Sequence, residues 1–174
     1  MRQNQIRAAT DIPGCRGAII RFLRLVQISF ALVFLSAAIS EAAPEQITAP
    51  EAQEMIESGD LILIDIRTPE EWAATGHPAG SVMLDMRGKD FLRYIVAIRK
   101  ARPEKTIGFI CATGGRTGYL TRFLEKNGFL GTVDVSEGMM GSRKGPGWLK
   151  HGLPLEKADH SENGERLKDI LSGE

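Results

Sequence analysis

The segment CATGGRT, from Cys111 to Thr117, places a possible nucleophile beside groups that could activate it. The thiolate is the reactive form of cysteine, and the positive end of a helix dipole favours it. A helix is expected to begin four or five residues after Cys111, and the small residues between could curl with their N–H groups turned inward as an anion-binding nest. The candidate site, for a thiolate, a bound oxyanion or both, consists of Cys111 and Arg116 with the loop residues Ala112, Thr113, Gly114, Gly115 and Thr117.

Two other interpretations of this segment are open. Cysteine is often a buried and inert side chain, and an ordinary strand-to-helix turn could follow it without any chemistry. Two consecutive glycines and Arg116 are more than such a turn requires, so the spacing favours a reactive site. A nucleotide-binding loop is disfavoured because the sequence lacks the pattern Gly-x4-Gly-Lys-Ser/Thr.

The elements that must position this loop alternate between strands and helices. Continuous apolar or branched runs predict strands at 61–66, 81–86, 106–110 and 132–135. Such alternation predicts an α/β fold, with a central parallel β-sheet of about five strands flanked by helices. Ligands of parallel sheets bind outside the carboxyl ends of the strands, and Cys111 directly follows the strand 106–110.

Capping residues indicate where the helices begin and end. Thr48 with Glu51, and Thr68 with Glu71, have the spacing of capping boxes, so a helix is expected after each threonine. The amphipathic pattern of 91–101 predicts a third helix. A fourth is expected at 116–128, and the expected helix ends are at Gly59, Pro103 and Gly128.

Residues 1–42 have the pattern of a secretory signal peptide. Five arginines precede the apolar run 25–39, and small residues follow it, so cleavage is expected after Ala42. The alternative is an uncleaved membrane anchor, which is disfavoured because the run is shorter than the about 20 apolar residues of a spanning helix. Cleavage would remove Cys15 and leave Cys111 as the only thiol of a periplasmic or secreted protein.

The composition is that of one ordinary globular domain. The chain has 174 residues, of which 43% are hydrophobic and 25% charged. We expect the folded domain at 43–158, followed by a C-terminal tail at 159–174 that contains a loosely docked helix. The formal net charge of zero gives no reason to expect nucleic acid as a partner.

Four motifs resemble those of single-domain, rhodanese-type sulfurtransferases, in the same order and over about residues 47–157. CATGGRT is similar to their active loop, Cys-x-x-Gly-x-Arg-Ser/Thr, and LIDIRTPEEW to their Asp-Val-Arg-Thr-Pro-Glu-Glu-Phe. GHPAGS is similar to Gly-His-Ile-Pro-Gly-Ala, and SEGMM…GWLKHGLPLE to a closing Leu-Glu-Gly-Gly…Trp…Gly-Leu-Pro. The chain departs from this pattern in a proline that comes one place early and in extra glycine-rich residues, GSRKGPG, before Trp148.

The resemblance implies transfer of a sulfane sulfur in two displacements, without a metal or an organic cofactor. The Cys111 thiolate would take the sulfur from thiosulfate or a persulfide, and a thiol or cyanide would remove it. The amides of 112–117 would stabilise the anion, and Arg116 would hold the loop and attract the donor. The resemblance also implies that Asp65 and Arg67 form a supporting ion pair.

Four further residues are assigned mainly structural roles. His77 is expected to be a hydrogen-bonding loop residue without a catalytic role, and Trp148 a core residue. The match to the closing motif places Met139 at the rim of the site. His151 is expected on the solvated surface.

Two alternative functions are weighed against sulfur transfer. The fold is also similar to that of dual-specificity phosphatases and related arsenate reductases, but cysteine phosphatases need Cys-x5-Arg to surround a phosphate. Only four residues separate Cys111 from Arg116, so the tighter loop favours a sulfane sulfur. The other alternative is a binding or sulfur-carrier module without turnover. Such members usually lose the cysteine, which this chain keeps.

Overall fold

The structure is a computed structural model that describes residues 45–173. The expected signal peptide at 1–42, its cleavage site and Cys15 lie outside the described residues. Within 45–173, no helix combines the length and the apolar character needed to cross a membrane.

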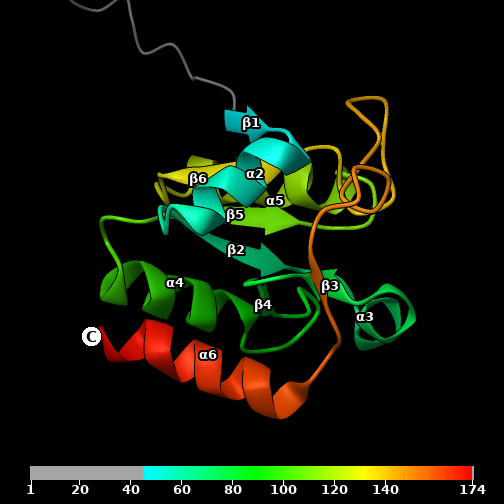
Figure 1. Cartoon of the computed structure of the whole chain (residues 1–174). Coiled ribbons are helices and arrows are strands. Elements are labelled where there is room, and N and C mark those ends of the chain that lie inside the picture. Colours follow the sequence, from blue (N-terminus) through cyan, green and yellow to red (C-terminus); the bar gives the residue numbers. More distant parts are fainter. Residues whose placement is uncertain (1–44, 174) are drawn as a thin grey trace, which may run out of the picture. The chain divides into compact units, whose positions relative to one another are not determined.

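A five-stranded parallel sheet forms the centre of the domain (Figure 1). Its strand order is β1-β6-β5-β2-β4, so β5 is the middle strand. The strands are β1 (Glu45–Ile47), β6 (Thr132–Val135), β5 (Thr106–Ile110), β2 (Leu61–Asp65) and β4 (Val82–Met83). The predicted α/β fold with a parallel sheet of about five strands is therefore confirmed.

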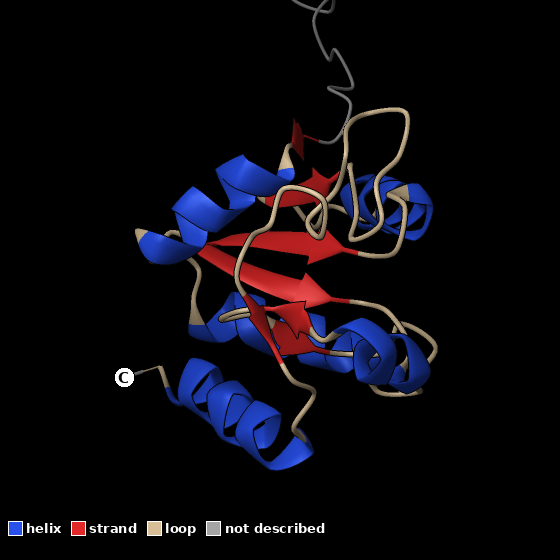
Figure 2. Cartoon of the chain, turned by 45° about the vertical axis from the view of Figure 1, so that its right-hand side comes forward, coloured by secondary structure: helices blue, strands red, loops and turns tan. Residues whose placement is uncertain are grey.

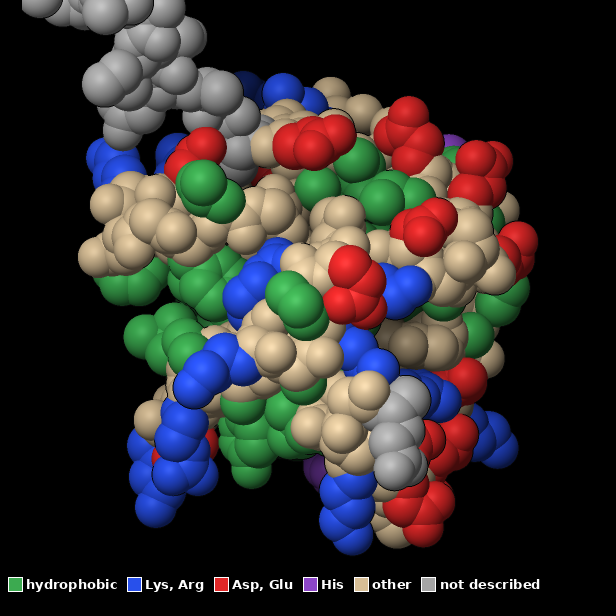
Figure 3. Space-filling view, turned by 90° about the vertical axis from the view of Figure 1, so that its left-hand side faces the viewer, with side chains coloured by type: hydrophobic (Ala, Val, Ile, Leu, Met, Phe, Trp, Pro, Cys, Tyr) green, Lys and Arg blue, Asp and Glu red, His purple; other side chains and the backbone are tan. Residues whose placement is uncertain are grey.

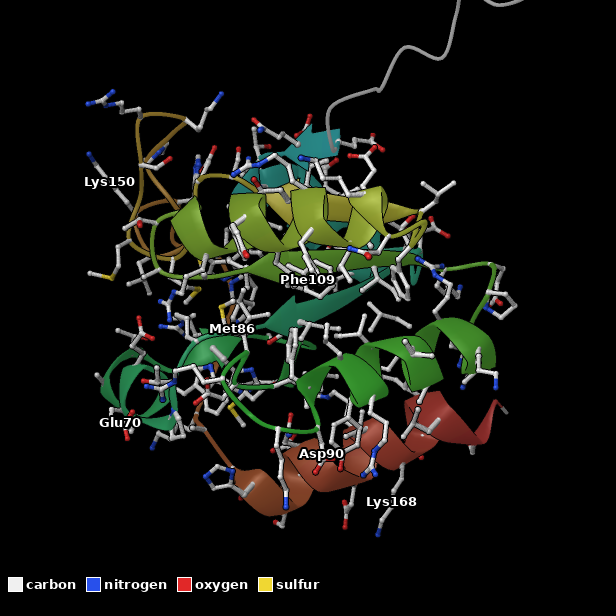
Figure 4. All side chains as sticks on the ribbon, turned by 180° about the vertical axis from the view of Figure 1, so that it is seen from behind. Glu70, Met86, Asp90, Phe109, Lys150 and Lys168 are labelled. Atoms are coloured by element: carbon white, nitrogen blue, oxygen red, sulfur yellow. The ribbon has the colours of Figure 1, made fainter. Side chains whose placement is uncertain are left out.

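Helices cover both faces of the sheet, with α2 on the face opposite α4 and α5 (Figures 1 and 4). Each face has its own hydrophobic cluster, because side chains of a strand alternate between the two faces. The α2 face buries Leu63, Ile110 and Val133, and the opposite face buries Ile64, Ile107 and Phe109. The helices are α2 (Ala49–Glu57), α3 (Pro69–Thr75), α4 (Phe91–Ala101), α5 (Gly115–Lys126) and α6 (His160–Ser172).

Both predicted capping boxes are present and begin α2 and α3. The Thr48 hydroxyl accepts from the Glu51 N–H, and the Glu51 carboxylate accepts from the Thr48 N–H. Thr68 and Glu71 make the same reciprocal pair at α3. Each box supplies acceptors for N–H groups that have no partner inside the helix.

The observed strands differ from the prediction in some of their end residues and in the short strands. β2 ends at Asp65, one residue before the predicted end, and the predicted strand 81–86 is reduced to Val82–Met83. β1 was not predicted, because its three residues bury only Ile47. The loop around His77 contains β3 (His77–Pro78), which pairs with β7 (Leu155–Glu156) in a small antiparallel sheet.

The helix expected in the C-terminal tail is α6, and it covers the edge strand β4. The Asn163 side chain accepts from the Met83 N–H (2.7 Å) and donates to the Met83 carbonyl (3.1 Å). Arg166 donates to the Ser81 carbonyl (2.7 Å). These bonds occupy backbone groups that an open sheet edge would otherwise expose.

The two ends of the sheet differ in what they present. Loops gather beyond the carboxyl ends of the strands, toward which the arrows in Figure 2 point. The face at the amino ends, shown in Figure 3, carries Lys, Arg, Asp and Glu side chains with hydrophobic side chains between them. Cys111 directly follows β5, so the candidate site lies at the carboxyl end of the sheet.

Candidate active site

Cys111 lies where the connections of the sheet diverge. From β5 the chain continues through α5 to β6 on one side, whereas from β2 it continues through α3 to β4 on the other. β2 and β5 are neighbours, and the Ile66 N–H donates to the Ile110 carbonyl at their ends. Ligands of open α/β sheets bind at such a switch point.

The loop 111–117 curls tightly into the start of α5. Gly114 has a left-handed backbone (φ +77°), and a side-chain carbon there would clash with the Ser136 carbonyl oxygen. The first bond of the helix is donated by the Gly118 N–H to the Gly114 carbonyl (3.0 Å). In the described part of the chain, the amides of 112–117 donate no backbone hydrogen bond, so these N–H groups have no backbone partner, as an anion-binding nest requires.

The segment after β6 fastens this loop from the other side. The Met139 N–H donates to the Cys111 carbonyl and the Met140 N–H to the Ala112 carbonyl, both at 2.8 Å. The close approach needs Gly138 (φ +70°), where a side-chain carbon would lie 2.6 Å from the Ala112 carbonyl oxygen. The loop that holds Cys111 is thus fixed by backbone contacts to a second segment.

The prediction that Met139 lines the rim is wrong. Met139 is fully buried in the cluster that contains Trp148, and Met140 is the exposed neighbour (60%). Backbone bonds on both residues turn the first side chain inward and the second outward. Trp148 is buried, as predicted.

The Cys111 thiol lies inside the loop and is 1% exposed. Its Sγ is 3.7 Å from the Oγ1 of Thr117, a residue that is itself fully buried. The Thr117 hydroxyl donates to the Gly114 carbonyl at 3.0 Å. The helix start therefore brings a hydroxyl to the sulfur.

Arg116 is paired with a carboxylate of α3. Its Nη2 donates to Glu71 Oε1 at 2.6 Å and its Nη1 to Glu71 Oε2 at 2.8 Å. The Arg116 guanidinium holds the pKa of the Glu71 carboxyl below its usual value, and Glu71 raises the pKa of Arg116. The nearby Cys111 side chain is a smaller cause of the raised pKa of Arg116.

Asp65 and Arg67 form a buried ion pair with an N–O distance of 2.7 Å. Arg67 is 1% exposed and also donates to Thr75 Oγ1 (2.8 Å) and to the Gly76 carbonyl (2.7 Å), both at the end of α3. The pair thereby fixes α3 to the end of β2. Since α3 carries Glu71, the pair supports Arg116 indirectly.

The model of the rhodanese-like domain matches residues 48–143 of the chain. The chain belongs to the rhodanese-like domain family. Uncharacterized protein RP600 homolog of Rickettsia rickettsii is 29% identical over 119 residues, which cover 64% of this chain and 97% of that protein.

Two solved structures share the rhodanese-like fold. Rv0390 from M. tuberculosis has a TM-score of 0.53 and 22% identity, over 67% of this chain and all of the other. The Alr3790 protein from Anabaena sp. has a TM-score of 0.55 and 16% identity, over 72% and 93% of the two chains. Identities this low show the fold alone.

Three contacts of the rhodanese-like domain were not predicted from the sequence. The Glu71–Arg116 pair was missed because Glu71 already had a role in the capping box. The buried Glu137 accepts from the Gly147 N–H (3.1 Å), and His151, expected on the solvated surface, bonds to it (2.9 Å). That pair folds the extra glycine-rich residues around Glu137.

Two further findings concern groups outside the loop. His77 Nδ1 and Ser81 Oγ are hydrogen-bonded at 2.8 Å, so His77 does form a hydrogen bond as predicted, although it lies in the strand β3, and burial lowers its pKa. Within the described residues, no three His, Cys, Asp or Glu side chains are grouped so that they could hold a metal ion.

Proposed function

We propose that this rhodanese-like protein is a sulfurtransferase that carries a sulfane sulfur on Cys111. The observation that supports it most is a buried thiol followed by the amides of 112–117, which donate no backbone hydrogen bond within the described residues, with only four residues between Cys111 and Arg116. A loop of this size suits one additional sulfur atom better than a tetrahedral phosphate. Membership of the family supports the same reaction class.

The proposed reaction has two displacements. The Cys111 thiolate attacks the outer sulfur of thiosulfate or of a persulfide, a new S–S bond forms, and the old bond breaks with its electron pair leaving on sulfite or a thiolate. A thiol or cyanide then attacks the outer sulfur of the Cys111 persulfide. This second step restores the thiolate, so no oxidant, reductant or cofactor is consumed.

The residues around the sulfur would have distinct roles in these steps. The amides of 112–117 and the Thr117 hydroxyl stabilise the negative charge that passes between thiolate and persulfide. Arg116 adds positive charge, and Glu71 holds it in place while reducing the net charge of the pair. Because Cys111 is 1% exposed, small donors such as thiosulfate suit the site better than bulky ones.

Intact mass spectrometry tests this function. The protein is incubated with thiosulfate, and we expect a gain of one sulfur atom that is absent from the Cys111→Ser variant. An unchanged mass together with turnover of p-nitrophenyl phosphate would support the phosphatase alternative instead. An unchanged mass without turnover would support a binding module.

We further propose that the protein acts in the periplasm or outside the cell, after removal of residues 1–42. The basic residues and apolar run of this segment support the proposal. Sequencing the amino terminus of the native protein should find Ala43 first. A membrane-bound protein that begins before residue 25 would show an uncleaved anchor and contradict it.

A further inference from the structure

A buried carboxyl group on β6 has no part in the mechanism described so far. Asp134 is 3% exposed, and within the described residues its Oδ1 is buried without a hydrogen-bond partner. Buried carboxylate oxygens are normally paired, because an unpaired one loses its hydration without compensation. Such a group needs an explanation.

The register of the sheet places Asp134 near Cys111. Asp134 pairs with Phe109 of β5, so both side chains point to the face covered by α4 and α5, where Phe109 is labelled in Figure 4. Cys111 lies two residues beyond Phe109 and belongs to the same hydrophobic cluster. From the spacing of strands and residues, the Cα atoms of Asp134 and Cys111 are about 8 Å apart.

The first turn of α5 lies over both groups. The Thr117 hydroxyl is 3.7 Å from Cys111 Sγ, and its interaction with Asp134 opposes the larger effect of burial, which raises the pKa of that carboxyl. The next residue is Gly118, where a side-chain carbon would lie 3.3 Å from Asp134 Oδ2. Thr117 is therefore the side chain that can join the carboxyl to the sulfur.

Two cations also face Asp134. Arg122 of α5 and Lys144 of the loop after β6 each act to lower the pKa of the carboxyl. Their effects are smaller than that of burial, which remains the first cause of the raised pKa. Within the described residues Asp134 forms no salt bridge, so both cations act on its carboxyl from a distance.

We propose that Asp134 is a positioning residue that sets the charge state of the sulfur on Cys111 through the Thr117 hydroxyl. When Asp134 is protonated, its O–H donates to Thr117 Oγ1, and the Thr117 O–H turns from the Gly114 carbonyl to a thiolate or persulfide anion. When Asp134 is ionised, the Thr117 proton turns to the carboxylate, and two negative charges oppose each other. The persulfide part of this inference rests on the proposed sulfurtransferase function, but the thiolate part does not.

The coupling has a predictable size. We take the Cα separation of about 8 Å as the separation of the Asp134 and Cys111 charges. Two unit charges at that distance, at an effective dielectric constant of about 20, shift a titration by about 1.5 pH units. Replacing Asp134 with a neutral residue should therefore lower the pH midpoint of thiolate formation by about this amount. Asn should act at least as strongly as Ser, because its amide can also donate to Thr117.

The test is a titration of the full chain followed by the ultraviolet absorbance of the thiolate. Subtracting the titration of Cys111→Ser removes the signal of Cys15. Asp134→Asn is the main variant, and Asp134→Ser is a smaller replacement. Asp90→Asn is the matched control, since Asp90 is a partly exposed aspartate at the start of α4.

The expected result is a midpoint lowered in both Asp134 variants and unchanged in Asp90→Asn. A midpoint that stays the same or rises in Asp134→Asn would overturn the proposal, as would failure of both variants to fold, because Asp134 would then be structural. The titration does not depend on a sulfur donor. A thiol that shifts as expected but takes no sulfur from thiosulfate would refute the proposed function alone.

Discussion

Glu71→Gln isolates the contact between α3 and the loop that holds Cys111. Gln is nearly the same size as Glu and can also serve at the third position of a capping box, so the start of α3 should survive the change. What is lost is the charge of the pair with Arg116, whose N–O distances are 2.6 and 2.8 Å. The comparison therefore measures the ion pair and little else.

The size of the effect follows from geometry and exposure. Hydrogen bonds to charged groups contribute about 1.5–3 kcal/mol when well shielded. The Arg116 and Glu71 side chains are 33% and 32% exposed, so solvent screening reduces the expected loss to about 1 kcal/mol. For a domain of this size, that corresponds to a fall of about 4 °C in the unfolding temperature.

The effect should depend on pH with a defined sign. Because Arg116 lowers the pKa of Glu71 in the folded protein, the pair contributes stability above the unfolded pKa of 4.5. This contribution is lost as the pH falls through the lower, folded pKa. The difference between the parent protein and Glu71→Gln should therefore be full at neutral pH and shrink as the pH falls below 4.5 and through the lower, folded pKa of Glu71.

Urea unfolding of both proteins at several pH values measures this difference. Glu54→Gln on the exposed side of α2 is a control for the loss of one negative charge. Equal stability of the parent and Glu71→Gln at neutral pH would refute the contribution of the pair. A difference that does not shrink at any pH below 4.5 at which the protein still folds would show that it does not arise from the ionised carboxylate.

Three further predictions concern the supports of the site and the fold. Gly114→Ala should cost at least about 2 kcal/mol and reduce sulfur uptake, since a side chain there meets the Ser136 carbonyl at a positive φ; thermal unfolding and intact mass measure the two effects. Arg67→Met should lower the free energy of unfolding in urea by about 3–5 kcal/mol, because it leaves Asp65 buried and unpaired. A double variant that also neutralises Asp65 should lose less stability than the sum of the two single changes. Burial lowers the pKa of His77 in the folded protein, so the unfolded state binds a proton first as the pH falls below 6.5, and the free energy of unfolding should then decrease. Urea unfolding between neutral pH and about pH 5 should show a weaker pH dependence for His77→Gln than for the parent protein.

The strands and helices of the centre could be predicted because their signals are local. The apolar runs of β5 and β6 and the two capping boxes lie within a few residues, and each is present as predicted. The short strand pairings β1–β6 and β3–β7 could not be predicted, because two or three residues show no periodicity and their partners are distant in the sequence.

The candidate site likewise contains parts with a local sequence signal and parts without one. The curl of 111–117 into α5 follows from its glycines and the expected start of a helix. The Glu71–Arg116 pair joins residues 45 positions apart, and no local pattern connects them. Asp134 did leave a signal, since an acidic residue within the buried strand TVDV is unusual, but only the register of β5 and β6 brings it near Cys111.

Discharge of the loaded protein is a direct test of whether Cys111 carries a transferable sulfur. Protein treated with thiosulfate and freed of excess donor is mixed with cyanide, and its intact mass and the thiocyanate released are measured together. We expect that the protein gains one sulfur, loses it to cyanide with an equal amount of thiocyanate formed, and does neither when Cys111 is replaced by serine. Sulfur that stays on the protein, or that also loads the Cys111→Ser variant, would contradict it.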